Sequence, residues 1–499
     1  MSVVLINPPQ LFSKTQVTAG VVPPLGLLYL SAYLKRHGFP VEFIDALGEW
    51  HTQYTQWNTM MLRGLTFEEI VRRIPAAGRV IGISLLYSSS YLAIRELVRL
   101  IRIANPGALI VLGGAHASCL SEYTLKNTEA DCIVIGEGEQ PLLAICRDPA
   151  GLGSINGIVF KKNGRIHVNP AQELIADLDE IPMPDWRAIK LESYFSANEP
   201  HGCSWHKKWV PVLAGRGCPY ECTFCTTPLI WRRRWRVRSV QNVLEEMEFL
   251  YRNYGVTDFH FEDENLGANK KWLHQFCEEL SARNLPVVWQ PSNGMRAETL
   301  LDPGLMEKMK RTGCTLVVFT LESASERVRN QIIRKHLDIV NVEKAVILAR
   351  KEKIKSTCYF MVGLPDETLQ EAKETIRYAH RLARLGLDEC VIGLFSLLPG
   401  CELFNQQYAA GKVALTPEFF EDLLSIGDLS RFKSWSENIS SEDLKRLRFR
   451  GYAGFVFFKA LFYPGKILRS LLNLCLGRDE LKSERVLRTF IKRVAGRGQ

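Results

Sequence analysis

Three cysteines lie within eight residues, in a segment that reads Gly-Arg-Gly-Cys-Pro-Tyr-Glu-Cys-Thr-Phe-Cys from residue 215 to residue 225. A short loop rich in glycine and proline can point three thiolates at one centre, and such a ligand set suits a metal ion or an iron–sulfur cluster. On a four-iron cluster, three protein ligands leave one iron open to a small molecule. A structural zinc ion would need a fourth ligand, which His201 or His206 could supply. Buried, inert thiols are the third alternative.

The spacing is Cys218-x3-Cys222-x2-Cys225, directly after the apolar segment 210–214, and Phe224 precedes the last cysteine. This pattern resembles the signature of the radical S-adenosylmethionine enzymes. The resemblance implies that the three cysteines hold a [4Fe–4S] cluster, whose open iron binds the amino and carboxylate groups of S-adenosylmethionine, and that Phe224 lies beside that ligand. Because the spacing is short and specific, it favours the cluster over zinc or inert thiols.

The length of 499 residues exceeds one ordinary domain and predicts about three. Apolar residues make up 46% of the chain, enough for full-sized cores, but no apolar run reaches the ~18 residues that a membrane span requires. Met1 is followed by a strand-like run over residues 3–6 rather than by a secretory signal. Thirteen cysteines in such a chain indicate reduced thiols and metal ligands, and therefore a cytoplasmic protein.

The net charge of +9 is concentrated at one end of the chain. Residues 441–499 hold 14 Lys and Arg but 5 Asp and Glu, and this excess equals the net charge of the whole protein. A uniformly basic surface for nucleic acid is therefore not supported. Any electrostatic partner is expected to meet the last segment.

Residues 2–150 alternate short apolar runs with helical patterns, which predicts an α/β domain with an open parallel sheet between two layers of helices. The expected strands are 3–7, 40–45, 80–85, 108–113 and 130–136. Each ends in loop-forming residues, and the ligands of such sheets bind beyond the carboxyl ends of the strands. No Gly-x-Gly-x-x-Gly follows the first strand, which argues against a dinucleotide. The layout predicts a Rossmann-like domain for another cofactor.

The strand-end loops resemble those of the cobalamin-binding domain of cobalamin-dependent radical S-adenosylmethionine enzymes. The matching residues are Asn7, Pro8, Pro9, Gly26, Ser84, Leu85, Gly113, Gly114, Gly136, Glu137 and Gly138. The resemblance implies that they line the cobalamin slot, where a side chain in place of glycine would collide with the ligand. The Asp-x-His-x-x-Gly motif that ligates cobalt in other cobalamin domains is missing. His116 either contacts the cofactor or is structural, and an empty, vestigial domain is the alternative to cobalamin binding.

Residues 151–206 predict a hairpin and an extended linker. Two strand patterns flank Asn163-Gly164, a strong hairpin signal, and a stretch rich in proline and acidic residues follows at 178–186. Residues 207–403 then alternate strand and helix. The expected strands are 210–214, 258–262, 287–291, 316–321, 357–363 and 390–397, with helices notably at 240–254, 271–283, 305–312 and 369–385. Six β/α units match the partial (β/α)6 barrel of the radical family, whose functional loops gather at the carboxyl ends of the strands.

Residues that follow these strands are assigned by the resemblance to S-adenosylmethionine binding. They are Glu262, Asp263, Arg296, Glu322, Ser323, Gly363, Pro365 and Pro399. The acidic pair after the second strand is expected to hold the amino group, and the pair after the fourth strand the ribose or methionine portion. The fifth and sixth loops would offer backbone to the adenine, and the arginine could pair with the carboxylate as a planar fork. Taken singly, each acidic residue could instead lie in a solvated loop, and the arginine could lie on the surface without binding S-adenosylmethionine.

Two basic segments remain. Residues 231–238 read Trp-Arg-Arg-Arg-Trp-Arg-Val-Arg, which could stack on bases and contact phosphates, but an acidic cofactor tail or structural packing is favoured because the charge outside the tail is balanced. Residues 404–499 predict a basic helical domain, and over 442–474 aromatic residues alternate with basic ones. That stretch could lie on an anionic bilayer, making the protein peripheral to the membrane, although aromatics that cap the barrel and form a substrate wall are favoured.

The resemblance as a whole implies an enzyme with three cofactors: a [4Fe–4S] cluster, S-adenosylmethionine and cobalamin. The expected reaction methylates an unactivated carbon, with a 5′-deoxyadenosyl radical taking a hydrogen atom from the substrate and methylcobalamin giving the methyl group. The expected partners are a small, hydrophobic substrate and an electron donor such as flavodoxin or ferredoxin. The alternatives are a non-methylating ring formation, ring contraction or oxidation, a tRNA methylthiotransferase, and a non-catalytic corrinoid sensor. The scattered positions of Cys119, Cys132 and Cys146 argue against the second cluster of a methylthiotransferase.

Overall fold

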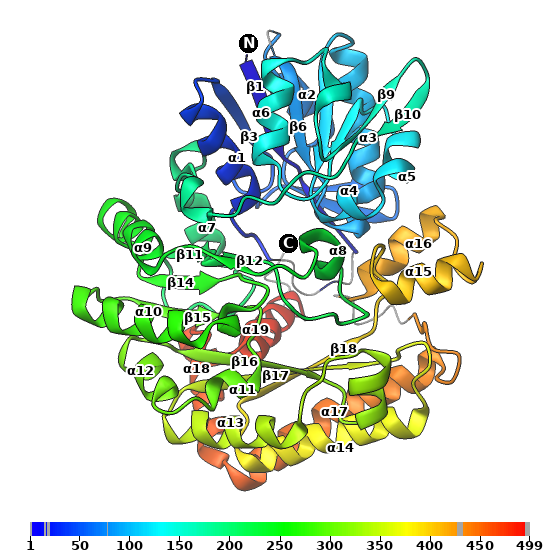
Figure 1. Ribbon diagram of the computed structural model, residues 1–499. Coiled ribbons are helices and arrows are strands. Elements are labelled where there is room, and N and C mark those ends of the chain that lie inside the picture. Colours follow the sequence, from blue (N-terminus) through cyan, green and yellow to red (C-terminus); the bar gives the residue numbers. More distant parts are fainter. Residues whose placement is uncertain (1, 14–15, 17–19, 77, 427–432, 495–499) are drawn as a thin grey trace.

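The computed structural model describes residues 2–13, 16, 20–76, 78–426 and 433–494. Figure 1 shows an N-terminal sheet domain above a barrel, with the C-terminal helices below and beside the barrel. The α/β fold that the sequence predicts, with a sheet domain, a barrel and C-terminal helices, is confirmed.

The first domain is built on a seven-stranded sheet of order β10-β9-β8-β7-β6-β1-β3. Its strands are β1 (Ser2–Asn7), β3 (Val41–Asp45), β6 (Gly78–Ser84), β7 (Leu109–Gly113), β8 (Cys132–Val134), β9 (Ile158–Lys162) and β10 (Arg165–Val168). The strands from β3 to β8 pair in parallel, whereas β9 pairs antiparallel with β8. The strand order reverses between β1 and β6, and the crevice at such a point is where doubly wound sheets bind ligands.

Helices cover both faces of this sheet because successive side chains of each strand point to opposite sides. Val3 and Leu5 of β1 face the core under two helices, α1 (Leu25–Arg36) and α6 (Glu139–Arg147). Val4 and Ile6 face the opposite core. That core is covered by α2 (Phe67–Arg73), α3 (Tyr91–Ala104), α4 (Ala115–Cys119) and α5 (Ser121–Lys126).

Two features of this domain were not expected from the sequence. A small antiparallel sheet joins β2 (Gln10–Phe12), β4 (Tyr54–Trp57) and β5 (Met60–Arg63). The expected hairpin is present as β9 and β10, with φ of 51° at Asn163 and 74° at Gly164 as a tight primed turn requires, but it extends the main sheet instead of standing in a linker. Helix α7 (Leu191–Ala197) follows on the path to the barrel.

The barrel consists of two three-stranded parallel sheets joined edge to edge. The first contains β11 (Trp209–Val212), β14 (Asp258–Phe261) and β15 (Val288–Pro291), and the second contains β16 (Leu316–Glu322), β17 (Lys355–Val362) and β18 (Glu389–Leu394). Parallel bridges from Trp289 to Cys314 and from Met295 to Phe319 connect them. Each of the six strands overlaps the strand that the sequence predicts.

Helices follow the barrel strands, and each of them except the first, which is short, buries apolar side chains. They are α8 (Thr227–Trp231), α9 (Val240–Tyr254), α10 (Lys270–Arg283), α11 (Ala297–Leu300), α12 (Leu305–Arg311), α13 (Ile339–Lys351) and α14 (Leu369–Leu385). A two-stranded ribbon of β12 (Gly215–Arg216) and β13 (Arg236–Val237) precedes α9. Local chemistry sets the bounds of α14: Thr368 and Glu371 form a capping box at its start, and Gly386 ends it in the left-handed conformation.

The C-terminal part is helical, as predicted. It contains α15 (Glu402–Ala409), α16 (Pro417–Asp422), α17 (Ser441–Phe462), α18 (Pro464–Leu476) and α19 (Lys482–Val494). Helix α17 packs on α14, and α18 packs between α17 and α19. A break at Tyr463 divides the helical stretch, because Pro464 begins a new helix but cannot continue one. No helix in the described ranges is both long and apolar enough to span a bilayer.

Candidate functional site

A cavity of about 1450 Å³ lies between the sheet domain and the barrel. Its walls come from the carboxyl ends of the first-domain strands, from the mouth of the barrel and from the C-terminal segment. This volume exceeds the ~300–1,000 Å³ of ordinary small-molecule sites. The cavity can therefore hold a large cofactor together with a second ligand.

The sheet-domain wall of the cavity contains most of the residues that the sequence assigns to cobalamin. They are Asn7, Pro8, Pro9, Gly26, Ser84, Gly113, Gly114, Gly136, Glu137 and Gly138. Asn7 ends β1 and Ser84 ends β6, so these two residues mark the reversal point of the strand order. The structure thus brings the sequence-assigned loops to one crevice.

Glycines give this wall the shape of a slot. A Cβ atom added at Gly26 or Gly113 would have no protein atom within 4 Å, so a side chain at either position would extend into the cavity. Gly114 has φ of +117°, and a Cβ there would lie 2.7 Å from the Leu85 carbonyl oxygen. The open glycine positions form a cradle that fits a broad, flat group such as a corrin ring.

Two assigned residues lie elsewhere. Leu85 and His116 are buried in the core and are not part of the cavity wall. His116 Nδ1 is 2.8 Å from Ser88 Oγ and its Nε2 is 3.3 Å from Thr124 Oγ1, and burial lowers its pKa to about 3. Of the two roles that the sequence left open for His116, this geometry supports the structural one, and both residues lie away from the cavity wall.

Glu137 joins the two domains. Its carboxylate receives hydrogen bonds from Arg216 at 2.9 Å and from Arg236 at 3.0 Å, both from the barrel part, and Arg216 also pairs with Glu139 at 2.6 Å. These side chains are at most 11% exposed. Burial raises the pKa of Glu139, but the charge and hydrogen bond of Arg216, a backbone hydrogen bond and the charge of Arg236 together hold that pKa below its ordinary value. No pattern in the sequence indicated this ion-pair cluster.

The cysteine loop begins after β11 and is fixed at its base. Asp263 accepts hydrogen bonds from the backbone N–H groups of Ala214 (3.0 Å) and Gly215 (2.6 Å), and Glu264 accepts one from Gly217 (3.0 Å). Burial raises the pKa of Asp263 to about 7. These hydrogen bonds place Asp263 to hold the loop. Asp263 does not line the cavity, whereas the sequence predicts that it contacts the amino group of S-adenosylmethionine.

The three thiols of the loop are half-buried and lie near one another. Burial, together with the neighbouring Cys225 and Cys222, raises the pKa of Cys218 to about 11. Three thiolates at this place need a compensating positive charge, which iron ions supply. Within the described residues no three His, Cys, Asp or Glu side chains are grouped as ligands of a metal ion. Ligands of a four-iron cluster bind different irons and need not converge on one ion.

The histidines considered for zinc are engaged away from the cysteine loop. His201 Nδ1 lies 3.2 Å from Glu262 Oε2, and His206 Nδ1 lies 3.3 Å from the Thr257 carbonyl oxygen. Glu262 itself lines the cavity, and its Oε1 atom is buried without a hydrogen-bond partner. A buried, unsatisfied carboxylate oxygen suits a cationic ligand group, such as the amino group expected here.

Three further residues assigned to S-adenosylmethionine gather at the cysteine loop. Arg296 lies over the Tyr220 ring, 4.1 Å from its centroid, and donates hydrogen bonds to the carbonyl oxygens of Lys335 (2.8 Å) and His336 (2.6 Å). Glu322 has a strained φ of 68° and pairs with Lys335 at 2.8 Å, and Lys335 Nζ lies 5.8 Å from the centroid of Phe224. Sequence reasoning missed Lys335, which no local pattern marks.

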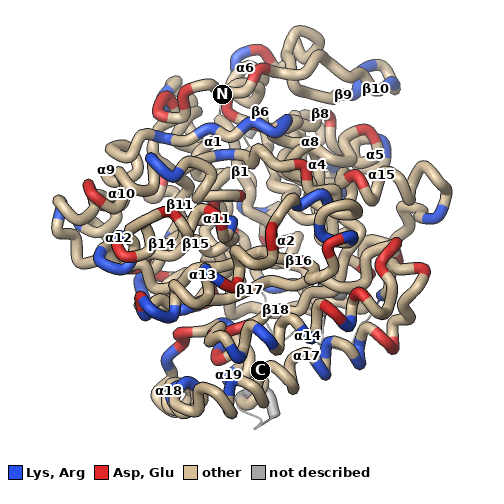
Figure 2. The backbone as a smooth tube through the Cα atoms, turned by 60° about the horizontal axis from the view of Figure 1, so that its bottom comes forward, with Lys and Arg blue, Asp and Glu red and all other residues tan. Residues whose placement is uncertain are grey.

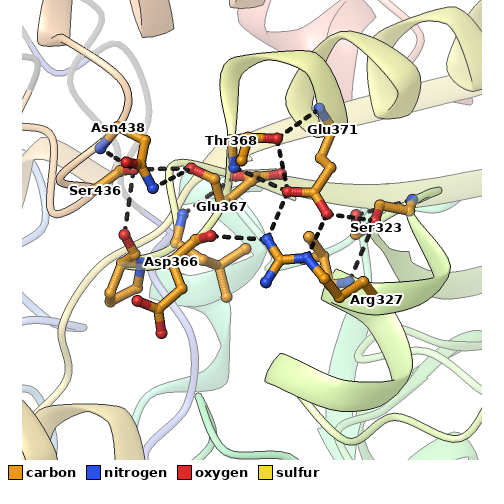
Figure 3. Close-up of polar contacts among 12 residues, drawn as sticks. Ser323, Arg327, Asp366, Glu367, Thr368, Glu371, Ser436 and Asn438 are labelled. Carbon is orange, nitrogen blue, oxygen red and sulfur yellow. Dashed lines mark hydrogen bonds and ion pairs between the residues drawn. The ribbon is translucent and has the colours of Figure 1, made fainter.

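Ser323, Gly363 and Pro365 belong to a hydrogen-bonded network that fixes two barrel loops. Figure 3 shows Ser323 with other members of this network, among them Glu367 and Ser436. Ser323 Oγ lies 3.1 Å from Thr375 Oγ1, and the Gly363 N–H donates to Glu367 at 2.5 Å. The Pro365 carbonyl oxygen accepts from Ser436 at 3.4 Å. None of these residues, nor Pro399, lines the cavity as described. Pro399 precedes Gly400, where a Cβ would lie 2.5 Å from Cys119 Sγ of the first domain.

Most arginines of the 231–238 segment bind protein groups. Arg236 pairs with Glu137, Arg238 with Glu246 at 2.6 Å, and Arg233 with Glu221 at 2.8 Å. The Trp231 indole N–H donates to Glu264 at 2.7 Å. These contacts support the structural packing that the sequence favoured over nucleic acid.

The wall contributed by the C-terminal segment was also missed. Gly477, Lys482, Arg485, Arg488 and Thr489 line the cavity. The sequence predicts a basic segment whose aromatic residues form a substrate wall, but three of the side chains that reach the cavity are cationic and none is aromatic. Only the path of α19 brings them there, and no spacing in the sequence reports that path (Figure 1).

Comparisons with known proteins agree with this layout. Residues 15–146 match the family model of the B12 binding domain, and residues 212–379 match that of the radical SAM superfamily. The uncharacterized methyltransferase PH0819 of Pyrococcus horikoshii is 28% identical over 91% of this chain and 92% of its own length. The cytidylyl-2-hydroxyethylphosphonate methyltransferase of Streptomyces wedmorensis is 27% identical over 78% of each chain. The anaerobic magnesium-protoporphyrin IX monomethyl ester cyclase of Rubrivivax gelatinosus is 30% identical over 75% of this chain and 65% of its own.

Solved structures share the fold. The radical S-adenosylmethionine methyltransferase TsrM from Kitasatospora setae, with cobalamin and a [4Fe–4S] cluster, matches with a TM-score of 0.65 at 18% identity, covering 84% of this chain and 80% of its own. OxsB with aqua-cobalamin and S-adenosylmethionine matches with a TM-score of 0.67 at 15% identity, covering 99% and 75%. With its B12-binding domain, its radical S-adenosylmethionine domain and the cofactors that these imply, the chain is a cobalamin-dependent radical S-adenosylmethionine enzyme.

Proposed function

We propose that this enzyme is a methyltransferase that acts on an unactivated carbon of a small molecule. The observation that carries the proposal is the cavity of about 1450 Å³, which the cobalamin slot and the barrel mouth share. A substrate between them can meet both cofactors without leaving the protein. The methyltransferases of P. horikoshii and S. wedmorensis, which align over most of this chain, support the methylating reaction over others.

The chain's own residues would bind and orient the reactants. Cys218, Cys222 and Cys225 would hold the cluster, and Glu262 would accept a hydrogen bond from the amino group of S-adenosylmethionine through its free Oε1. When bound, the cluster supplies the electron that cleaves S-adenosylmethionine and cobalamin supplies the methyl group. The apolar residues Leu213 and Phe195 would exclude water from the substrate.

The products of S-adenosylmethionine test this proposal before any substrate is known. The enzyme is reconstituted without oxygen, supplied with cobalamin and a reductant, and incubated with candidate substrates. A methyltransferase converts S-adenosylmethionine to both 5′-deoxyadenosine and S-adenosylhomocysteine, whereas a cyclase forms 5′-deoxyadenosine without S-adenosylhomocysteine. Liquid chromatography with mass spectrometry measures both products, and 5′-deoxyadenosine alone would remove the methylation proposal.

The second candidate function is a non-methylating ring formation. The cyclase of R. gelatinosus, at 30% identity, favours it. A methylthiotransferase has less support, because Cys132 and Cys146 are buried in one apolar core while Cys119 lies near Cys225, so the three do not form a separate site. A corrinoid sensor would bind cobalamin and form no 5′-deoxyadenosine. The electron donor proposed for either reaction is a cytoplasmic flavodoxin or ferredoxin.

A further inference from the structure

The cationic wall of the cavity comes from the N-terminal part of α19, between Lys482 and Arg488. Lys482, Arg485 and Arg488 face the space into which the two domains open. Arg488 is neutralised by an ion pair with Asp479. Arg485 and Lys482 take part in none of the ion pairs found among the described residues. The wall therefore carries positive charge that the protein leaves available.

Arg485 is the clearest sign of a missing anion. It is only 7% exposed, and its Nε and Nη1 atoms have no hydrogen-bond partner. An unpaired buried guanidinium costs several kcal/mol, so buried arginines are almost always paired with an anion. Nε and Nη1 lie on different edges of the guanidinium, and each offers an N–H that can donate a charge-assisted hydrogen bond to a carboxylate or phosphoryl oxygen.

The groups that face Arg485 and Lys482 do not remove the need for an anion. Burial lowers the pKa of Lys482, and the repulsion between Lys482 and the positive charge of Arg485 lowers it further. Glu389 accepts hydrogen bonds from the Ser483 N–H at 2.6 Å and from Thr357 Oγ1 at 3.2 Å. Glu262 pairs with His201. Glu262 Oε1 has no hydrogen-bond partner, but neither Glu389 nor Glu262 forms an ion pair with Arg485 or Lys482 among the described residues.

We propose that Arg485, with Lys482 beside it, binds an anionic oxygen group of the substrate, so that the substrate is an organic acid carrying a carboxylate or phosphoryl group. The apolar residues Pro211, Leu213 and Phe195 line the same cavity and suit an apolar body attached to that group. This assignment rests on the proposed function, because it places the substrate in the cavity that the cofactors share.

Inorganic phosphate is the probe. Its binding to the reconstituted holoenzyme is measured by equilibrium dialysis at constant ionic strength, for the native protein, for Arg485→Gln and for Arg478→Gln, which alters an exposed arginine just before α19. The native protein and Arg478→Gln are expected to bind phosphate. Arg485→Gln is expected to bind it at least tenfold more weakly, and a fourth protein, Arg485→Lys, is expected to bind it with intermediate affinity. Circular dichroism checks that each variant is folded. Equal binding by all variants, or none by the native holoenzyme, would overturn the proposal.

Two further readouts separate the substrate from the cofactors. Cobalamin uptake and S-adenosylmethionine binding should be unchanged in Arg485→Gln. If either is lost, or if only protein free of cobalamin binds phosphate, then Arg485 serves a cofactor and the substrate assignment is wrong. None of these measurements depends on methyl transfer. A native enzyme that forms no S-adenosylhomocysteine would refute the proposed function without changing the phosphate result, so the two failures can be told apart.

A second inference rests on the outer surface of α17 and α18. Phe449, Phe457 and Leu468 are 74%, 61% and 67% exposed. Further exposed apolar side chains on these two helices are Val456, Leu461, Phe462, Leu471, Leu472 and Leu476. The spacing of Leu468, Leu472 and Leu476 puts them on one face of α18. Monomeric soluble proteins rarely leave so many large apolar side chains uncovered in adjoining helices.

Basic residues accompany these apolar side chains. Lys445, Arg446 and Arg450 lie within one turn of Phe449 on α17, and Lys and Arg recur along this helix in Figure 2. We propose that this face docks on an anionic lipid bilayer, because apolar insertion and basic charge together favour such a surface. The favoured prediction that the aromatics of this segment cap the barrel does not account for the exposed ones.

Vesicle sedimentation tests the docking surface. The full protein should sediment with vesicles of phosphatidylcholine and phosphatidylglycerol, and about tenfold less with phosphatidylcholine alone. The double variant Phe449→Ser, Leu468→Ser should lose binding, and Ile103→Ser, which removes a 66% exposed side chain from α3, should keep it. If size-exclusion chromatography shows a dimer that only the double variant dissociates, a second copy covers the face and the membrane proposal fails.

Discussion

Cys222 illustrates what single residues contribute. Burial raises the pKa of its thiol, while the nearby Lys335 lowers it and Cys225 raises it again. The protein by itself does not favour three neighbouring thiolates, so loading of iron and ionisation of the cysteines should be coupled.

Replacement of Cys222 by alanine tests this coupling. Loss of a ligand should exceed the 10–100-fold cost of losing a second-shell contact, so bound iron and 5′-deoxyadenosine formation should both fall by more than about 100-fold. Cys475→Ala, which removes an exposed thiol on α18, is the matched control. Iron analysis and chromatography measure the outcome. A Cys222→Ala protein that retains a full cluster would show that this loop is not its site.

Gly113 tests the slot in the sheet domain. The variant Gly113→Val adds a strand-favouring side chain where nothing in the protein opposes it, so folding should persist while cobalamin binding weakens at least about tenfold, or ~1.4 kcal/mol. Gly107→Val adds the same side chain to a glycine with equally open surroundings outside the cavity. Absorbance of bound cobalamin after dialysis reports the affinity. Equal binding by the two variants would move the cofactor away from Gly113.

The sequence was informative at this scale where chemistry is local. The cysteine spacing and the glycine loops could be recognised because their function depends on neighbours in the chain. Lys335 and Arg485 could not be recognised, because each is distant in the sequence from the loop or the other cavity residues that it faces in the fold. His116 lies within a recognised loop, yet the turn of α4 directs it into the core.

The loop after β17 shows how an element is held in position. Glu367 accepts hydrogen bonds from the backbone N–H groups of Gly363 and Leu364, and its Oε1 atom is buried without a partner. Burial raises its pKa from 4.5 to about 7. Between these values the unfolded chain has lost a proton that the folded protein keeps, so the stability contributed by this group falls as pH rises from about 4.5 to about 7.

Glu367→Gln keeps a hydrogen-bond acceptor and removes the titration. The variant should therefore lose less stability than the native protein between about pH 5 and about pH 7.5, with a difference on the order of 3 kcal/mol at most. Thermal unfolding at the two pH values measures it. Glu307→Gln on the exposed side of α12 should behave like the native protein. Parallel pH curves for all three proteins would show that Glu367 is ionised at neutral pH.

Helices and strands could be predicted where the spacing of apolar residues matches one type of element over its whole length. The barrel strands and helices α9 and α14 were placed from apolar periodicity, because each buries one face along its whole length. The strands β2, β4 and β5 escaped notice, because they are short and β2 pairs with residues about fifty positions further on. The hairpin was seen, but its attachment to β8 depends on a pairing that local sequence does not encode.

At the scale of the molecule, the buried cluster around Arg216 joins the sheet domain to the barrel. Arg216→Ala would leave the buried carboxylates of Glu137 and Glu139 short of a partner, which costs about 3–5 kcal/mol. Calorimetry should show the two domains unfolding at separate, lower temperatures. Lys190→Ala breaks the exposed pair with Glu49 and should cost less than about 1 kcal/mol. A single, unshifted transition in Arg216→Ala would mean that other contacts hold the domains together.

Helix α19 follows both domains along the chain, yet it forms part of the chamber between them. During synthesis the ribosome releases this wall after the sheet domain and the barrel have emerged, and domains fold in that order. The nascent enzyme thus passes through a stage in which the slot and the cysteine loop are formed while the chamber stands open on one side. Insertion of the bulky corrinoid would be easiest in that interval, which makes cofactor supply during translation a determinant of the yield of active enzyme.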